Sequence, residues 1–300
     1  GGPQIFDPLT LNPSTNTREP FPGNVIPKTR FGQMGNSSLK YYPAPNTPPS
    51  GGFNYVVSDS GRNDGDQFHT RIDHQIGEKD SLFGRYSYSQ GEVISPAGLP
   101  LTGGLQETKA NSITVQESHT FSATKVNQFR VYWTYFKDRA GFPLADRNLA
   151  AEEFGLLNLT PASTAYGLPQ LIVTGLTTMG ANPFQPFGPR ENTYGLADDF
   201  SWIAGRHAMK FGFDGRYYRP AALVQQTPNS ILTFENRFTN QPGVSGTGSA
   251  VADLLLGFPY SGRATQFAES NGWVTLKYYY FGFYVQDEIR LTPTFTINLG

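Results

Sequence analysis

Residues 59–66 read DSGRNDGD and bring Asp59, Asn63, Asp64 and Asp66 close to two glycines. Carboxylate and amide oxygens on a glycine-bent loop are ligands that Ca²⁺ prefers. The segment departs from the D-x-[DN]-x-[DN]-G spacing of a calcium loop and lacks the glutamate that should follow. These departures favour an acidic surface turn, so we expect no metal ligand here.

The four histidines do not have the spacing of a metal site either. They are His69, His74, His119 and His207, and the first two fall on opposite faces of an extended run. The sequence contains no G-x-S-x-G, H-E-x-x-H or G-x-x-x-x-G-K-[ST] motif, and the glycine-rich stretch 243–250 lacks the lysine of a phosphate loop. We therefore predict no enzyme, with no catalytic, metal-binding or cofactor-binding residue and no cofactor.

Charged residues instead alternate with apolar ones along extended runs. In RIDHQIGEKDSLFGRYSYSQ, residues 71–90, two such runs flank the corner Gly77–Asp80. Strand side chains point to opposite faces with period two, which predicts a β-hairpin with one apolar and one ionic face. The first run has on its apolar face Phe68, Thr70, Ile72, His74 and Ile76, and on its ionic face His69, Arg71, Asp73 and Gln75.

The same alternation recurs in three further pairs of runs, with corners at 122–125, 204–207 and 291–294. The apolar faces carry Phe129, Val131, Trp133, Tyr135, Tyr194, Leu196, Phe200, Trp202, Met209, Phe211, Phe213 and Tyr217, and Asp198 interrupts them. The ionic faces carry Arg71, Asp73, Arg85, Lys210, Asp214 and Arg216. These ionic side chains fit either a lining that contacts a plug or solute, or a cross-strand charge ladder, which we favour.

Composition points to an all-β chain. Among 300 residues, 14% are aromatic, and 33 glycines and 23 prolines leave little room for long helices. The net charge of −1 gives no excess of positive charge that would attract nucleic acid. The absence of cysteine excludes disulfide bonds. No apolar stretch approaches the roughly 20 residues of a membrane-spanning helix, so strands would have to cross a membrane.

Connection lengths indicate the architecture. Residues 1–65 show no sustained period and are predicted to be an irregular segment of extracellular-loop type, followed by strands over 66–300. The four corners are short, whereas the connections 92–108, 138–190 and 219–272 are long, an asymmetry typical of outer-membrane barrels. We predict part of an antiparallel up-and-down transmembrane β-barrel, an open sheet of roughly eight strands with short turns on one side and long loops on the other.

Several segments, in this order, resemble the barrel region of TonB-dependent outer-membrane receptors, above all the Oar-like branch. They are FPGNVIPKTRF with YYPAPN, RIDHQIGEKDSLFGRYSYS, HTFSATKVNQFRVYW, GRHAMKFGFDGRYYR, ADLLLGFP and FYVQDEIRLTPTFTINLG. The resemblance implies a 22-stranded barrel closed by a plug and energised through a TonB box. Neither plug nor TonB box is recognisable in this chain, so the resemblance implies an internal barrel fragment.

The leading functional hypothesis is a part of a receptor in the cell outer membrane for energy-coupled uptake of a scarce solute. Its implied partners are outer-membrane lipid, the TonB complex through a plug domain not present in this chain, and an unidentified solute. The long loops would grip that solute, since binding sites often lie on loops carried by a rigid scaffold. The alternative is a secreted or surface-attached soluble β protein for adhesion or carbohydrate binding, which would bury its aromatic faces between sheets.

Overall fold

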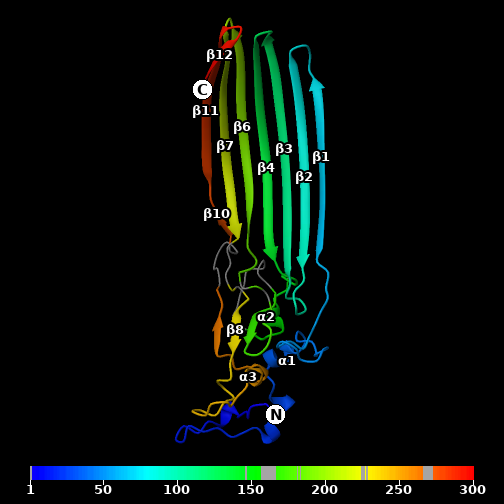
Figure 1. Cartoon of the computed structure of the whole chain (residues 1–300), viewed down its shortest axis with the longest axis vertical. Helices are drawn as coiled ribbons and strands as arrows, with labels where there is room; N and C mark the ends of the chain where they lie inside the picture. The colour runs from blue at the N-terminus through cyan, green and yellow to red at the C-terminus, as the bar shows by residue number, and fades with distance from the viewer. Residues whose placement is uncertain are drawn as a thin grey trace.

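The computed structural model describes residues 2–145, 147–156, 167–180, 182, 184–223, 227, 229–265 and 273–300. Over these residues the strands form two sheets. Figure 1 shows the long strands side by side at one end of the molecule, and the helices with the short strands at the other end.

The long sheet is antiparallel, and its strands follow chain order in space. The path is β1 (Arg62–Gln75), β2 (Asp80–Ser95), β3 (Gly104–Ser122), β4 (Lys125–Gly141), β6 (Gly188–Ala204), β7 (His207–Leu223), β11 (Tyr278–Thr292) and β12 (Phe295–Leu299). A short strand, β10 (Trp273–Thr275), pairs with β7 just ahead of β11. In the described part of the chain β1 and β12 do not pair with each other, so the sheet is open. The prediction of an open antiparallel sheet with eight strands along its path is confirmed.

Short turns join the strands in pairs, as predicted. Gly77 and Gly205 have positive φ at two of these turns, which glycine adopts without a steric penalty. The first strand begins at Arg62 rather than at Asp66, because residues 62–65 pair with 91–94 of β2. The predicted acidic turn over 59–66 is therefore wrong, since most of that segment is strand.

The position of the turns reveals how far the strands are tilted. Relative to the hydrogen-bonded rows, each successive turn from β1–β2 to β11–β12 lies roughly two residues further along the strands. Successive turns are two strands apart, and neighbouring strands are about 4.8 Å apart. With a rise of about 3.3 Å per residue, this stagger tilts the strands by roughly 40° from the perpendicular to the line through the turns. Strands in closed barrels are tilted by about 35–45°.

The cross-strand register gathers the apolar residues on one side of the sheet, here called the aromatic face. One row runs through Phe68, Tyr88, Asn111, Tyr135 and Asn192, and the next through Thr70, Tyr86, Ile113, Trp133, Tyr194, Tyr217 and Tyr279. Ile72 is 72% exposed and Phe283 is 77% exposed, and no described layer covers this face. The aromatic side chains therefore do not form a dry interior between sheets.

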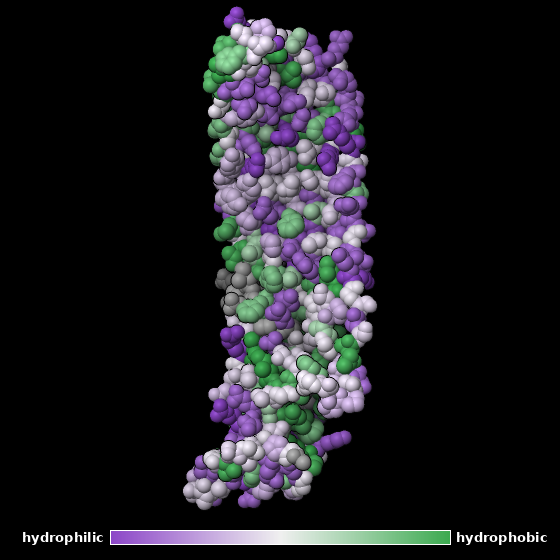
Figure 2. Space-filling view, viewed as in Figure 1, coloured by the Kyte–Doolittle hydropathy of each residue, from purple (hydrophilic) through white to green (hydrophobic). Residues whose placement is uncertain are grey.

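The opposite side of the sheet, here called the polar face, is more crowded. Thr193 is 6% exposed and Ala197 is 4% exposed, and both lie on β6 between β4 and β7. The ring of Tyr132 lies where a Cβ on Gly195 would be placed. Crowding on one face is expected when a sheet curves and that face is concave. Over the sheet, the side seen in Figure 2 is coloured mainly purple and pale, with scattered green.

The remaining segments fold together at the end of the sheet opposite the short turns, and we call them the loop unit. It contains η1 (Pro8–Thr10), η2 (Pro22–Asn24), η3 (Lys28–Arg30), α1 (Gln33–Ser38), α2 (Leu149–Glu152), α3 (Ala250–Leu256), and the sheet of β5 (Gln170–Val173), β8 (Ile231–Phe234) and β9 (Ser261–Arg263). In the part of the chain that the structure describes, no helix is long and apolar enough to cross a membrane.

The loop unit has its own hydrophobic core, which the sequence did not predict. Met34 from the N-terminal segment packs with Leu99 from the β2–β3 connection, Leu149 from the β4–β6 connection and Phe234 from the β7–β11 connection. All three long connections thus share one interior with residues 2–61. The division of the chain at residue 65 and the extracellular position of the N-terminal segment stay predictions.

Two carboxylates, one buried and one near the surface, form polar contacts within the loop unit. Asp253 on α3 is 0% exposed and accepts hydrogen bonds from the backbone N–H of Phe238 and of Thr239, each at 2.9 Å, and from the Thr239 hydroxyl at 2.6 Å. Burial raises the pKa of Asp253, and these hydrogen bonds oppose the rise. Glu153 accepts from Lys40 at 3.1 Å and from Tyr41 at 3.0 Å, and these contacts outweigh desolvation and lower the pKa of Glu153.

Replacing Asp253 with alanine should loosen the loop unit. The change leaves the buried donors of Phe238 and Thr239 without an acceptor, which costs about 3 kcal/mol of local stability. We expect faster hydrogen exchange across residues 237–249 and unchanged exchange in the long strands. Val251→Ala on the exposed side of α3 is the control. Equal exchange in the Asp253→Ala and Val251→Ala variants would contradict the central role of the carboxylate.

Single cysteines can test the orientation of the two faces, because the chain contains no cysteine of its own. Val115 lies on the aromatic face and its neighbour Thr114 on the polar face. In the predicted membrane-inserted state, a hydrophilic maleimide should label Thr114→Cys and leave Val115→Cys at least tenfold less modified. Preferential labelling of Val115→Cys would show that the faces are assigned the wrong way round.

Candidate functional site

A group of charged and aromatic residues on the polar face forms the candidate site, here called the luminal cluster. It consists of Arg130, Tyr132, Asp199, Asp214, Arg216 and Tyr284 from β4, β6, β7 and β11. The register brings them together: one row runs from Arg130 through Ala197 to Asp214, and the next from Tyr132 through Gly195 to Arg216. Only Asp214 and Arg216 of this cluster are among the predicted interior charges.

An ion pair lies at the centre of the luminal cluster. The Nε of Arg216 donates to both carboxylate oxygens of Asp214 at 3.0 Å, and its Nη1 donates to the Tyr218 hydroxyl at 3.2 Å. The guanidinium carbon also lies 5.4 Å from the ring centre of Tyr280. Beside this pair the Tyr284 hydroxyl donates to Asp199 at 2.6 Å. Most charges of the cluster are thus paired and oriented, so they present fixed donors and acceptors.

Glycines create the space that the large rings of this cluster occupy. A Cβ on Gly195 would overlap the ring of Tyr132, and a Cβ on Gly212 would overlap the ring of Tyr284. The rings lie over the neighbouring strands. Tyr284 borders a shallow groove of about 320 Å³ that is also lined by Arg130, Asp199, Asp214 and Tyr280, among others. The groove can hold a polar partner through hydrogen bonds and ion pairs.

Of the other predicted interior charges, Arg71, Asp73 and Arg85 lie on β1 and β2, away from the luminal cluster, and Lys210 lies one row from Asp199 on the polar face. Arg71 donates to Asp73 at 2.6–3.0 Å and stacks 4.1 Å from the ring centre of Phe83. Arg85 is the cross-strand partner of Arg71, and Lys210 lies in register with Ser201 and Gln286. Arg71 and Asp73 form an ion pair along one strand rather than part of a cross-strand ladder.

Three residues on the aromatic face come together near the turns, two from β3 and one, distant in the sequence, from β2. The ligand atoms of Asp80, Glu117 and His119 lie within 4.8 Å of one another, and His119 Nδ1 is 2.5 Å from the Asp80 carboxylate. His207 pairs with Asp287 in the same way at 2.6 Å. Sequence spacing carries no signal for these groupings, because only the strand register creates them. Asp198, also on this face, accepts from the Asn127 amide at 2.7 Å.

The acidic residues considered for Ca²⁺ do not form a loop. Asn63 faces the side opposite Asp64 and Asp66, because all three belong to β1. Asp64 forms an ion pair with Arg62, and Asp66 accepts from Gln90 at 3.2 Å. Their oxygens are thus committed to neighbouring side chains and do not converge on one point.

The structure describes the predicted ligand-binding loops, 92–108, 138–190 and 219–272, only in part. Their residues 146, 157–166, 181, 183, 224–226, 228 and 266–272 lie outside the described residues. The predicted bounds are too wide, because 92–95, 104–108, 138–141, 188–190 and 219–223 are strand in the long sheet. The other described parts lie in the loop unit, and exposed rings such as Phe184 and Tyr260 remain on its surface. Binding of a ligand by these loops stays a prediction.

The chain matches known proteins at the level of family and fold. The family model of the outer membrane beta barrel domain matches residues 1–300. A search of curated proteins finds no match. The crystal structure of the outer membrane transporter YddB from Escherichia coli is similar, with a TM-score of 0.51 and 9% sequence identity. The similarity covers 79% of this chain and 26% of YddB, and at this identity it concerns the fold alone.

The family explains the two faces of the long sheet. In an outer-membrane barrel the apolar band faces lipid and the interior is polar, so the aromatic face lies outward and the polar face, with the luminal cluster, lines the interior. The strand tilt, the short turns and the alternating register all agree with this arrangement. The chain belongs to the outer membrane β-barrel domain family and forms part of a transmembrane barrel in the outer membrane.

Proposed function

We propose that this chain is part of the barrel of a TonB-dependent receptor of the Oar-like branch, which takes up a scarce solute through a plugged barrel at the expense of inner-membrane energy. The observation that carries the proposal is the luminal cluster. Its paired charges and aromatic rings face the barrel interior, and no described residue of another layer covers them. A wall of oriented donors and acceptors suits a folded polar plug better than an apolar ligand.

The resemblance of ordered sequence segments and the similarity to an outer membrane transporter support the proposal. The arrangement of the chain supports it as well. Short turns lie at one end of the sheet, and a folded loop unit with its own core lies at the other, where a solute would first be met (Figure 1).

In the proposed mechanism the protein breaks and forms no covalent bond. The loop unit captures the solute at the cell surface. Asp214, Arg216 and Tyr284 then hold the plug through hydrogen bonds until force transmitted by TonB rearranges it. Polar contacts on the wall suit this role because water can replace them one at a time as the plug moves.

The soluble alternative has lost its main support. A secreted adhesion or carbohydrate-binding protein would bury its aromatic faces between sheets, whereas Phe281 and Phe283 are exposed. Membership of an outer-membrane family also argues against secretion of a free domain.

Crosslinking in cells tests the proposal. The complete protein encoded by the gene, carrying an affinity tag, should give a crosslinked adduct with TonB in cells that make both proteins. The same protein lacking its proposed TonB box should give none, which controls for chance proximity. A complete sequence without a plug, or the absence of a TonB adduct while the protein is folded in the outer membrane, would contradict the proposal.

A further inference from the structure

A row of cations crosses the aromatic face at the end nearest the loop unit. Lys109 on β3, Lys137 on β4 and Arg190 on β6 are direct cross-strand partners. Arg219 on β7 lies on the same face, opposite Asn192. We call these four residues the basic band. They are like charges on neighbouring strands, an arrangement that destabilises a sheet unless an anion compensates it.

Four carboxylates share this end of the aromatic face. Asp66 lies in the same row as the basic band, with Gln90 between it and Lys109, and accepts from the Gln90 amide at 3.2 Å. The other three have arginine partners. Glu92 accepts from Arg62 at 3.2 Å and Glu107 lies 3.7 Å from Arg139, while Asp64 pairs with Arg62. In the described part of the chain no ion pair is formed by Lys109, Lys137, Arg190 or Arg219. Together with Arg62 and Arg139, the basic band gives six cations against four carboxylates at this end of the aromatic face, so the end keeps a net positive charge on the outside of the barrel.

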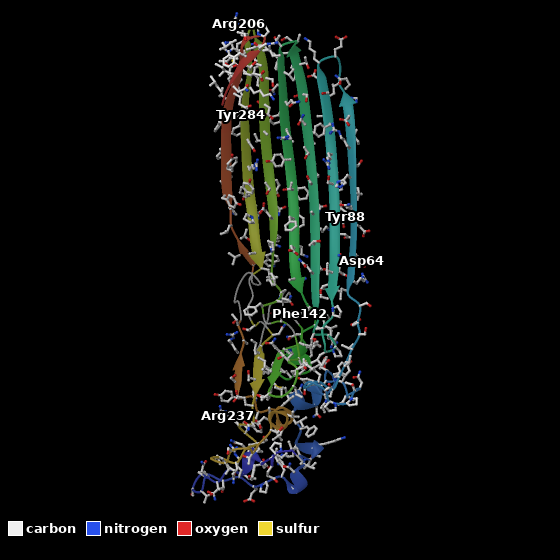
Figure 3. All side chains as sticks on the ribbon, viewed as in Figure 1. Asp64, Tyr88, Phe142, Arg206, Arg237 and Tyr284 are labelled. Atoms are coloured by element: carbon white, nitrogen blue, oxygen red, sulfur yellow. The ribbon has the colours of Figure 1, made fainter. Side chains whose placement is uncertain are left out.

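The basic band lies just beyond the apolar zone of the barrel wall. Along β6, Trp202 near the turn and Asn192 near the loop unit are ten residues apart. At a tilt of roughly 40° this length spans about 25 Å, the height of the apolar band of an outer-membrane barrel. Arg190 is the next residue on the same face. On β2, Tyr88 lies nearer the turns than the level of Asp64, as Figure 3 shows.

Aromatic rings place the cations at the membrane interface. The Lys109 ammonium lies 5.7 Å from the ring centre of Tyr88, and the Arg190 guanidinium lies 4.1 Å from that of Trp273. Tyrosine and tryptophan occupy the interface between hydrocarbon and headgroups, so the basic band is held at the level of the headgroups.

We infer that the basic band binds the phosphate groups of an anionic membrane lipid whose headgroup carries at least two phosphates. Adjacent strands hold the cations at spacings of about 4.8 Å, which lets one such headgroup contact two or three of them. The guanidinium of Arg190 can bind phosphate through two parallel hydrogen bonds. The acyl chains would lie along the exposed apolar side chains between the basic band and the turns, on Ile113, Val131 and Leu196.

The charge of the outer wall differs at the end near the turns. There the aromatic face carries the carboxylates of Asp80, Glu117 and Asp287, and Asp198 lies inside the apolar zone, four residues along β6 from Trp202. In the described strands Lys125 is the one lysine or arginine on this part of the face, so carboxylates outnumber cations there and repel anionic headgroups. The lipid is therefore bound only on the loop side of the membrane. A soluble anion would gain nothing from the apolar surface beside the band, which favours a lipid as the occupant.

Lipid titration of the complete protein in a neutral detergent tests this inference. The probes are a bisphosphorylated glycolipid, a zwitterionic lipid and inorganic phosphate, and native mass spectrometry counts the bound molecules. The triple variant Lys109→Gln, Lys137→Gln, Arg190→Gln should bind the bisphosphorylated lipid at least tenfold more weakly than the unaltered protein. Binding of the zwitterionic lipid should not change, and inorganic phosphate at matched ionic strength should not displace the bisphosphorylated lipid.

The matched control removes three cations near the turns, Lys79→Gln, Lys125→Gln and Arg206→Gln, and should leave lipid binding unchanged. The variant Lys109→Arg with Lys137→Arg should retain it. Equal losses in both triple variants, an unaffected basic-band variant, or displacement by inorganic phosphate would overturn the inference. If the triple variant fails to fold, as judged by migration of the unheated protein in gels, Lys137→Gln alone should still weaken binding at least threefold.

Discussion

The structure depends on one constraint: in hydrocarbon each backbone N–H and C=O must find its partner within the protein. Antiparallel pairing from β1 to β12 meets this demand along the sheet, except at the two open edges. Most strand pairs are in continuous register over 12 or more residues. The alternation of apolar and polar side chains along one strand therefore matches that of the next, and each face keeps one kind of side chain across the sheet. A slip by one residue would turn Trp133 and Arg130 to the wrong sides at once. The two faces and the basic band all follow from that register.

The side chains on each face reflect the medium they meet. Outward rings remain exposed and pack loosely with one another, as Phe213 does with Phe283 at a ring separation of 4.9 Å. Inward residues are crowded by curvature and meet their polar neighbours in pairs, as Arg216 meets Asp214. The same alternation therefore produces a surface that accepts mobile lipid chains and a wall with fixed polar contacts.

The strands and short turns could be predicted from the sequence because their signals are local. Alternation in 71–90 and the corner at 204–207 depend only on neighbouring residues. The core of the loop unit could not be predicted, because Met34, Leu99 and Phe234 show no common period and meet only through the fold. The luminal cluster was predicted in part: the faces of Asp214 and Arg216 follow from alternation, but their proximity to Arg130 requires the register. The grouping of Asp80 with His119 had no sequence signal for the same reason.

The shared core of the loop unit constrains the order of assembly. Met34 and Leu254 pack in one cluster although 220 positions separate them, and residues from two further connections complete it. Contacts between such distant segments close large loops and form slowly unless intervening structure shortens the path. The hairpins provide that shortcut by bringing the connections to one end. The core of the loop unit therefore forms after the strands have paired. Its formation can serve as a late marker that the long sheet has inserted correctly.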